Sequence, residues 1–473
     1  MTYWFSDTAM LERIDAAKAD LPAMRVGVYG LGISGLAMAE YLMRRGATVV
    51  LVDAKTPELP VVLAASDKII HRFGAVALEV FDDCDLLAIS PGIDPRKPEV
   101  TRVRDRGVPI VGELELSAPL PGLVAAVTGT NGKSTTTALL GVLASARGAR
   151  TFAGGNLGSP IANWVDQRPT DLASLELSSY QLETAYRFKP RAAVVLNVTP
   201  DHAERYTGLE DYAAAKAHIV ENQGPEDSAV LNADDAMVAA MAKKTKARVL
   251  WFSTRATKLP GQHGAWLEGD RVRAVGDAAV LDGLDLTHPR LFGRHNRENA
   301  LAAFLAVVGL GIIDEASRPR FESAYQEFKG LEHRLELVAE VHGVRYVNDT
   351  KATNDDSAAI AVAAMDRAVV LLAGGVDKGG GYARLVEASQ QRVRIVYAYG
   401  AAQKPIAEAF AKHPGLRLSA TMKTAFAEAA KEAKAGEVVL LAPACSSFDE
   451  FTNYAHRGRT FKELVQGLQR GAS

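Results

Sequence analysis

The stretch that most constrains the fold of this chain is residues 123–146. Its apolar beginning, residues 123–128, predicts a strand, and a helix-forming run follows from Thr135 to Ala146. The sequence G-T-N-G-K-S, residues 129–134, stands between them. A strand, a glycine-rich turn and a helix N-terminus make a cradle for anions, because backbone N–H groups and the helix dipole point at the bound group. This stretch therefore predicts a phosphate-binding loop in an α/β fold.

Two side chains of this loop have predicted roles in phosphate binding. Lys133 would neutralise phosphate oxygens, and the Ser134 hydroxyl would sit on Mg²⁺. The common spacing G-x-x-x-x-G-K-[ST] has a glycine where this chain has Val127, so the loop is a shorter form that starts at Gly129. The alternative is a glycine–asparagine turn followed by a surface lysine. The strand and helix on either side favour the phosphate loop.

The size and charge of the chain limit what it can be. Its 473 residues suggest about three domains at ~150 residues each. The 54 basic and 56 acidic residues leave a net charge of −2, which argues against nucleic acid or an anionic membrane as a partner. Cys84 and Cys445 make no disulfide framework and fit a reducing cytoplasm. Acids in the N-terminal segment and the lack of a long apolar run argue against a signal peptide and a membrane span.

The first part of the chain has the pattern of a nucleotide-binding fold. A strand at residues 25–29 leads into G-L-G-I-S-G, residues 30–35, then a helical run and a second strand that ends at Asp53. In this setting the glycines let the backbone approach a pyrophosphate, and Asp53 could bond a ribose or a base. A purely structural tight turn is the alternative. A later strand, residues 85–89, runs into a loop with Gly92, and strand–helix alternation stops near Val111.

Polar residues follow two apolar strands of the middle part. Glu176 lies at the end of the strand at residues 172–177, and His202 follows the strand at residues 192–198. A carboxylate on a buried strand is costly unless it is paired or metal-bound, so Glu176 is a natural Mg²⁺ ligand, with a solvated strand-end acid as the alternative. For His202 a site residue and a packed or surface residue are equally supported. Lys216 on the helix at residues 211–222 is expected to be exposed.

The last part, from Gly330, is a third α/β unit. Its strands run into polar loops at residues 348–354, 374–378 and 443–447. Active loops sit at strand ends of this kind. Their lysines, hydroxyls and glycine pair suit a small ligand that carries carboxylates. Cys445 has no histidine or acid beside it in sequence, so we interpret it as a packing residue.

Several motifs in this order resemble those of the Mur ligases of peptidoglycan synthesis. They are G-T-N-G-K-S-T, E-L-S-S-Y-Q-L-E, L-N-V-T-P-D-H, H-N-x-x-N and N-D-x-K-A-T-N, and the likeness spans residues 25–458. The run L-A-P-A-C-S-S-F-D-E-F-T-N-Y, residues 441–454, resembles the D-glutamate-adding branch. The D-N-P-R run of the diaminopimelate-adding members does not occur.

The resemblance implies both an architecture and a reaction. Residues 1–111 would be a Rossmann-like domain for the UDP substrate, residues 112–330 a P-loop ATPase-type domain, and residues 331–473 a Rossmann-like domain for the amino acid. The implied activity is an ATP-dependent ligase that adds D-glutamate to UDP-N-acetylmuramoyl-L-alanine through an acyl phosphate. It would use two Mg²⁺ ions, release ADP and phosphate, and work in the cytoplasm as a monomer.

The resemblance also implies site residues at matching positions. Those for catalysis and metal binding are Lys133, Ser134, Glu176, His202 and Lys216, the last as an anionic carbamate. Those for ATP are Gly129, Thr130, Asn131, Gly132, Lys133, Ser134, Thr135, Asn296, Arg334 and Asp349. Those for the UDP substrate are Gly32, Ile33, Ser34, Asp53, Lys55, Gly92, Asn156 and Ser178. Those for D-glutamate are Lys351, Thr353, Lys378, Ser447, Phe448 and Tyr454.

Other functions fit parts of the sequence. A sister Mur ligase or a folylpolyglutamate synthase is the nearest alternative; the first domain argues against the folate enzyme and the C-terminal run against the sisters. A nicotinamide-dependent oxidoreductase would use residues 30–35 but leave Lys133, Glu176 and His202 unexplained. A P-loop motor or switch protein would have no dedicated amino-acid site.

Overall fold

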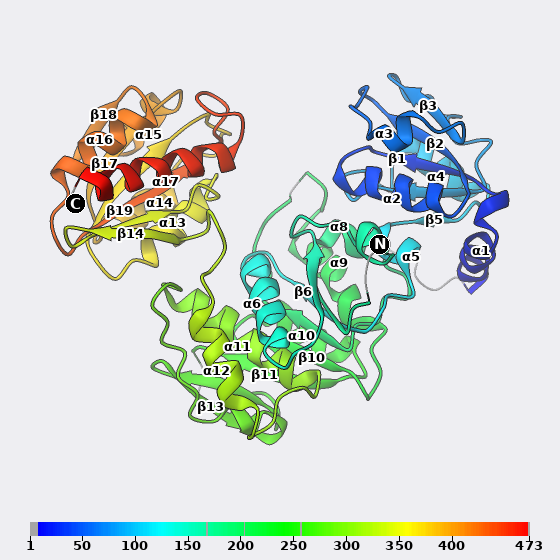
Figure 1. The fold of residues 1–473 in the computed structure, drawn as a ribbon, viewed down its shortest axis with the longest axis horizontal. Coiled ribbons are helices and arrows are strands. Elements are labelled where there is room, and N and C mark those ends of the chain that lie inside the picture. Colours follow the sequence, from blue (N-terminus) through cyan, green and yellow to red (C-terminus); the bar gives the residue numbers. More distant parts are fainter. Residues whose placement is uncertain (1–7, 167–168, 203, 256–257, 472–473) are drawn as a thin grey trace. The chain divides into compact units, whose positions relative to one another are not determined.

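A computed structural model describes residues 8–166, 169–202, 204–255 and 258–471, and the chain divides into two compact units (Figure 1). The first unit comprises residues 1–286 and 298–325, and the second comprises residues 287–297 and 326–473. Within the described residues the strands form three sheets, of five, eight and six strands. In this part of the chain none of the helices combines the length and apolar character needed to cross a membrane.

The N-terminal sheet is parallel, with strand order β3-β2-β1-β4-β5. Its strands are β1 (Arg25–Tyr29), β2 (Thr48–Asp53), β3 (Ile69–Phe73), β4 (Leu86–Ile89) and β5 (Ile110–Val111). Its helices are α1 (Thr8–Ala19), η1 (Leu21–Ala23), α2 (Ile33–Arg44), α3 (Val61–Ala64) and α4 (Pro98–Asp105). The order reverses between β1 and β4. Ligands bind outside the carboxyl ends of the strands at such a switch point.

The short helix α5 (Glu113–Ser117) leads into the central sheet, with order β13-β12-β11-β10-β9-β6-β8-β7. Its strands are β6 (Leu123–Thr128), β7 (Thr151–Gly155), β8 (Leu172–Glu176), β9 (Ala192–Val195), β10 (Ser228–Asn232), β11 (Arg248–Ser253), β12 (Gly264–Glu268) and β13 (Arg271–Val275). The helices that follow β6, up to residue 327, are α6 (Lys133–Ser145), α7 (Ile161–Trp164), α8 (Ser179–Leu182), α9 (Leu209–Glu221), α10 (Ala236–Ala240), η2 (Met241–Lys244), η3 (Gly276–Leu281), α11 (Arg294–Gly309) and α12 (Arg318–Glu327). All pairs are parallel except the β12–β13 hairpin.

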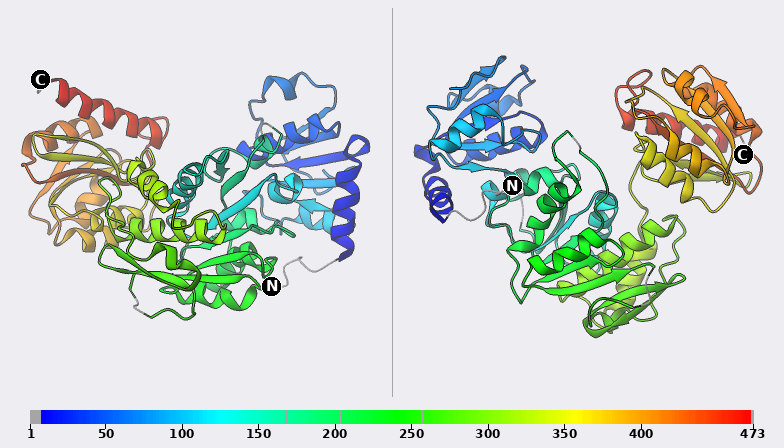
Figure 2. Two further views of the ribbon diagram at one scale, coloured as in Figure 1. Left: turned by 60° about the horizontal axis from the view of Figure 1, so that its bottom comes forward. Right: turned by 180° about the vertical axis from the view of Figure 1, so that it is seen from behind.

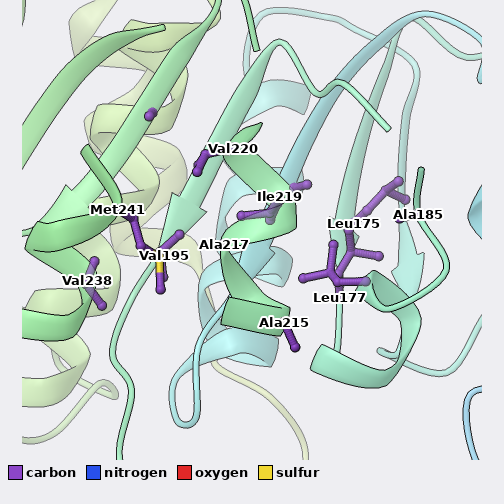
Figure 3. Close-up of a cluster of buried hydrophobic side chains, with 14 of the residues drawn as sticks. Leu175, Leu177, Ala185, Val195, Ala215, Ala217, Ile219, Val220, Val238 and Met241 are labelled. Carbon is purple, nitrogen blue, oxygen red and sulfur yellow. The ribbon is translucent and has the colours of Figure 1, made fainter. Parts of the chain in front are cut away.

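Helix α9 packs into the core against this sheet (Figure 3). The buried cluster includes Leu175, Leu177, Val195, Ala215, Ala217, Ile219 and Val220. Because α9 is covered on most sides, Lys216 is carried inside with its alanine neighbours and is only 1% exposed. The expectation of an exposed lysine at this position was therefore wrong.

The second unit has a six-stranded sheet with order β14-β15-β19-β16-β17-β18, in which only the β14–β15 pair is antiparallel. Its strands are β14 (Glu336–Val341), β15 (Val344–Asn348), β16 (Val369–Gly374), β17 (Val393–Tyr399), β18 (Leu416–Ser419) and β19 (Val438–Ala444). Its helices are α13 (Asp355–Ala363), α14 (Ala383–Ser389), α15 (Gln403–Ala409), α16 (Met422–Glu432) and α17 (Tyr454–Gly471). Two separate clusters cover the two faces: α13, α14 and α15 pack on one, and α16 and α17 on the other (Figure 2).

Two local predictions differ from the structure. Helix α6 begins at Lys133, two residues before the predicted start, because the left-handed Gly132 (φ 85°) closes the loop directly before it. The glycine-rich sequence of residues 154–158 predicts a loop, but Gly154 and Gly155 end strand β7 on the edge of the sheet. A glycine within a strand often marks a site where another part of the backbone approaches closely. A Cβ on Gly155 would lie 2.5 Å from the Glu176 carbonyl oxygen.

Candidate active site

The phosphate loop connects β6 to α6, and its backbone is fixed from a neighbouring strand end. The N–H groups of Thr130 and Asn131 donate to Oδ1 of Asn197 at 3.1 and 2.8 Å. A Cβ on Gly132 (φ 85°) would lie 2.2 Å from Oδ1 of Asn299, so any other residue there would strain the backbone and displace the Asn299 side chain. The loop is thus held in one shape, with the N-terminus of α6 at its end.

Two lysine side chains meet at the Gly129 carbonyl oxygen. Nζ of Lys133 donates to it at 2.8 Å and also to the Thr130 carbonyl at 2.8 Å. Nζ of Lys216 donates to the same Gly129 oxygen at 2.9 Å. Burial, together with the nearby Lys133 charge, lowers the pKa of Lys216 well below its ordinary value. The neutral amine of Lys216 is therefore favoured.

Glu176 brings a carboxylate to the same edge of the sheet. It is 2% exposed and pairs with Val127, two residues before the loop begins at Gly129, in the β6–β8 register. Its Oε1 accepts from Nδ2 of Asn156 at 2.7 Å, whereas Oε2 is buried and has no hydrogen-bond partner within the described part of the chain. An unpartnered buried carboxylate oxygen is costly and is also the ligand type that Mg²⁺ prefers. With the Ser134 hydroxyl in the first turn of α6, this donor set fits a magnesium ion.

His202 follows β9, the strand on the other side of β6. Its backbone is left-handed (φ 54°), a conformation that non-glycine residues rarely adopt. Nδ1 lies 2.9 Å from the Tyr180 hydroxyl and 3.2 Å from Oε1 of Glu204. The carboxyl ends of three adjacent strands, β9, β6 and β8, therefore carry the predicted histidine, phosphate loop and glutamate together.

Asn156 and Ser178, both predicted to contact the substrate, have local partners in the structure. Asn156 bonds Glu176, as described above, and its N–H donates to the Glu176 carbonyl at 2.9 Å. Ser178 is the N-cap of α8: its hydroxyl oxygen accepts from the N–H of Gln181, and the Gln181 side chain accepts from the N–H of Ser178. Both residues lie just after β7 and β8, beside the phosphate loop.

The predicted UDP residues lie at the carboxyl ends of β1, β2 and β4. The glycine loop is tight, since a Cβ on Gly35 would lie 1.9 Å from the Gly30 carbonyl oxygen. Asp53 closes this loop, accepting from the N–H groups of Leu31 at 2.7 Å and Lys55 at 2.9 Å. Positions Gly32 and Gly92 have open space where a Cβ would be, and Ile33 is 72% exposed. A ligand can therefore approach this backbone closely, next to Ser34 at the start of α2.

The N-terminal and central sheets are joined by polar contacts that sequence patterns did not reveal. Arg205 donates to the Ile93 carbonyl at 3.1 Å and forms a buried ion pair with Glu183. Glu113 of α5 accepts from the N–H of Ala162 at 3.0 Å, and burial raises the pKa of this carboxyl. The loop after β4 is thereby tied to the segment that carries His202.

In the second unit the predicted D-glutamate residues follow β15, β16 and β19, which are adjacent in the sheet. Nζ of Lys378 donates to Oγ1 of Thr353 at 3.1 Å, and Nζ of Lys351 lies 4.0 Å from the centre of the Tyr454 ring. Ser447 is 2% exposed, whereas the Phe448 side chain is 72% exposed. These loops bring two ammonium groups and a hydroxyl to one edge.

Of the three predicted ATP residues in this unit, two have described bonds that fix their side chains. Nδ2 of Asn296 donates to the Phe292 carbonyl at 2.8 Å, at the start of α11. Oδ1 of Asp349 accepts from the N–H of Leu335 at 3.2 Å, and burial raises the pKa of Asp349 to about 7. Asp349 directly follows β15, and Arg334 lies in the turn before β14.

Arg457 of α17 is a structural residue that sequence reasoning missed. It is fully buried, and its guanidinium donates only to uncharged groups among the described contacts. Its acceptors are Oγ1 and O of Thr350 and the carbonyls of Gly374, Cys445 and Ser446. It thus ties together the three loops with the predicted D-glutamate residues. No local pattern marks it, because one arginine on an amphipathic helix usually faces water.

Comparison with known proteins matches nearly the whole chain to one family. The MurD-like N-terminal domain of Mur ligases matches residues 24–112, the Mur ligase middle domain residues 127–307, and the Mur ligase glutamate ligase domain residues 333–445. A curated relative from Koribacter versatilis, named UDP-N-acetylmuramoylalanine–D-glutamate ligase, is 41% identical over 95% of this chain and 98% of its own length. A relative of the same name from Myxococcus xanthus is 40% identical over 95% of this chain and 99% of its own.

Solved structures agree at the level of the fold. A MurF ligase from Thermotoga maritima in complex with ADP has a TM-score of 0.59 at 18% identity, over 96% of this chain and all of that one. The UDP-N-acetylmuramate–alanine ligase of the same organism has a TM-score of 0.55 at 20% identity, over 94% of this chain and 99% of that one. From three family domains in order and full-length relatives at about 40% identity, it follows that the chain belongs to the Mur ligase family.

Proposed function

We propose that this protein is an ATP-dependent ligase that joins D-glutamate to UDP-N-acetylmuramoyl-L-alanine and releases ADP and phosphate. The observation that carries the proposal is the convergence of Lys133, Lys216 and Glu176 at the phosphate loop. It occurs in a chain whose curated relatives bear the name of this reaction over nearly their full length. The substrate carboxylate would take the γ-phosphoryl group, and the amine of D-glutamate would displace phosphate from the acyl phosphate.

The chain's own residues supply the positioning and charge that phosphoryl transfer needs. The ammonium of Lys133, held by two loop carbonyls, is placed to neutralise phosphate oxygens. ATP would be held by the loop residues 129–135 and by Asn296, Arg334 and Asp349. Magnesium would be held by Ser134, Glu176, His202 and Lys216 as a carbamate, and when bound it neutralises charge on the phosphate oxygens.

A carbamate on Lys216 is supported by the chemistry of its surroundings. A neutral Nζ can form a C–N bond to the carbon of CO₂ and lose one proton to solvent, which leaves an anionic carbamate. The lowered pKa of Lys216 favours that neutral amine. An unmodified, charged lysine would instead repel a nearby metal ion. The modification converts a cation into an oxygen ligand.

The UDP group would bind at the glycine loop, with Asp53 and Lys55 near the base and Gly32, Ile33, Ser34 and Gly92 near the pyrophosphate. Asn156 and Ser178 would contact the muramoyl part with the hydrogen-bonding capacity that their local partners leave. The loops of the second unit would hold the two carboxylates of D-glutamate through Lys351, Thr353, Lys378, Ser447, Phe448 and Tyr454. We also place the domain boundaries near residues 111 and 330 and expect a cytoplasmic monomer.

Phosphate release by the purified protein tests this function. Reactions contain ATP, Mg²⁺ and UDP-N-acetylmuramoyl-L-alanine, with D-glutamate, L-glutamate, L-lysine or diaminopimelate added singly. Phosphate and a UDP-linked dipeptide product should form only with D-glutamate. Turnover with an L-amino acid alone would indicate a sister ligase, and phosphate release without any amino acid would indicate an NTPase. In a separate reaction, a folate replaces the UDP substrate and L-glutamate is added; turnover only there would indicate a folylpolyglutamate synthase.

A further inference from the structure

The surroundings of His202 include a hydrogen-bonded pair that the proposed reaction does not use. The Tyr180 hydroxyl donates to Oε1 of Glu204 at 2.8 Å and lies 2.9 Å from Nδ1 of His202. The same Glu204 oxygen lies 3.2 Å from that nitrogen. The three side chains therefore form a closed triangle on the Nδ1 side of the imidazole.

The protons in this triangle can be assigned from the donors available. A tyrosine hydroxyl has one proton, so Tyr180 can donate to only one of its two neighbours. A carboxylate can only accept, so the proton of Tyr180 points at Glu204. The Tyr180 oxygen and Glu204 then both face Nδ1 as acceptors. A neutral His202 therefore carries its proton on Nδ1, and Nε2, which lies 3.7 Å from Oδ2 of Asp201, beyond hydrogen-bond distance, keeps its lone pair.

The ring of Tyr180 packs against Arg205, which is bonded to the loop after β4. The guanidinium of Arg205 lies 4.8 Å from the centre of the Tyr180 ring. Arg205 donates to the Ile93 carbonyl at 3.1 Å, and Arg96 donates to the Arg205 carbonyl at 2.6 Å. The rings of Tyr180 and His202 lie 4.8 Å apart, centre to centre. The orientation of His202 is thus set by a stack that begins at the loop after β4.

We propose that Tyr180 and Glu204 are positioning residues that hold His202 in the Nδ1–H tautomer, so that Nε2 is presented to a divalent cation. This inference rests on the proposed role of His202 as a metal ligand. Metal-binding histidines commonly donate their other ring N–H to a fixed acceptor, and losing that acceptor weakens metal binding roughly 10–100-fold. The backbone of His202 is in the left-handed region (φ 54°), and such a conformation persists only where surrounding contacts, here the side-chain hydrogen bonds, hold it.

Three variants separate this role from simple packing. Tyr180→Phe keeps the ring and removes the hydroxyl. Glu204→Ala changes a side chain that is 72% exposed, so the fold is retained. Without Glu204, the Tyr180 proton is free to turn to Nδ1, which would move the histidine proton to Nε2 and block the cation. Tyr206→Phe is the control, because its ring lies 6.0 Å from that of Tyr180 and its buried hydroxyl has no described hydrogen bond to His202.

Two measurements on the full-length protein test the proposal. The first is the tautomer of His202, read from the ¹⁵N chemical shifts of its ring in metal-free, ¹⁵N-histidine-labelled protein; a His202→Gln variant assigns the signal. The second is Mn²⁺ binding with ADP and bicarbonate present, followed by the electron paramagnetic resonance signal of free Mn²⁺. We expect Nδ1–H in the wild type, and roughly 10-fold weaker Mn²⁺ binding in Tyr180→Phe and in Glu204→Ala. The double variant should be no weaker than the single ones.

The possible results have distinct meanings. An Nε2–H tautomer in the wild type, or Mn²⁺ binding by Tyr180→Phe equal to that of Tyr206→Phe, would overturn the positioning role alone. A wild-type protein that binds no Mn²⁺ under these conditions would overturn this inference together with the proposed metal site. A tautomer shift in Glu204→Ala, with weaker Mn²⁺ binding in both acceptor variants but not in Tyr206→Phe, supports it.

Discussion

The Nζ atoms of Lys133 and Lys216 share one acceptor, the Gly129 carbonyl oxygen, at 2.8 and 2.9 Å. Two positive charges this close in a buried site repel each other strongly. Lys216 is the more deeply buried of the two, and its pKa falls well below the ordinary value because of that burial and of Lys133. One loop therefore joins a phosphate-neutralising cation to an amine that is ready for carbamylation.

The variant Lys133→Ala should lose turnover and keep its fold. Removing a preorganised charge from the reacting phosphate typically lowers kcat by roughly 10²–10³-fold. Steady-state phosphate release and circular dichroism melting measure the two properties. The exposed Lys243, changed to Ala, is the matched control and should retain wild-type rates. A Lys133→Ala variant within a few-fold of the wild-type rate would refute the phosphate-loop assignment.

The variant Lys216→Ala should be only weakly active, and added bicarbonate should not rescue it. The reason is that alanine has no amine to carry the carbamate. In the wild type, ¹³C-bicarbonate should produce a carbamate signal in the carbon NMR spectrum, and the variant should lack it. High activity of Lys216→Ala, or the same carbon signal in both proteins, would mean that the carbamate lies elsewhere or does not form.

The exposure of Lys216 shows where sequence patterns stop being informative. The phosphate loop could be predicted because its glycines, lysine and serine are adjacent in sequence, and β6 occurs with the predicted bounds. The burial of Lys216 depends on how α9 packs into the core of the central sheet, and no local pattern reports that packing. An alanine-rich helix with one lysine has the same composition whether it lies on the surface or in the core.

The same limit applies to residues that act through tertiary contacts. The strand-end positions of Glu176 and His202 were readable because parallel strands place their carboxyl ends at one edge. The roles of Tyr180 and Arg457 could not be predicted in this way, because their partners are distant in sequence. Tyr180 lies 22 residues from its partner His202, and Arg457 lies 107 residues from its partner Thr350. Strand β14 was also missed, because its half-buried pattern lacks clear alternation.

Gly132→Ala should destabilise the protein more than the comparable change at Gly148. Both glycines have nearly the same left-handed backbone, with φ of 85° and 83°. A Cβ at position 132 would lie 2.2 Å from Oδ1 of Asn299, whereas at position 148 it meets open space. Gly148→Ala should therefore cost only the backbone strain, about 1–2 kcal/mol, and Gly132→Ala should cost more. Urea unfolding measures the difference, and equal losses would show that the Asn299 contact relaxes freely.

Asn156→Ala should destabilise the protein, and Mg²⁺ should reverse part of the loss. Nδ2 of Asn156 is the donor to Oε1 of Glu176, and Oε2 has no hydrogen-bond partner among the described residues. Without Asn156, Oε1 of this buried carboxylate loses its donor as well, which costs about 1–3 kcal/mol. A cation bound at Glu176 would compensate for that loss. Thermal melting with and without Mg²⁺ is the measurement; a loss that Mg²⁺ leaves unchanged would argue against Glu176 as a ligand.

The stability of Asp349→Asn should differ from that of the wild type in a pH-dependent way. Burial raises the pKa of Asp349 from 3.8 to about 7 in the folded protein. As the pH rises from about 4 to 7, the unfolded chain releases the Asp349 proton while the folded chain keeps it, so the wild type loses stability over this range. Asparagine has no such proton and can still accept from the N–H of Leu335 through Oδ1. Urea midpoints should therefore be similar near pH 4 and favour the variant near pH 8. A difference that is constant between these pH values would show that Asp349 titrates in the folded protein as it does in the unfolded chain.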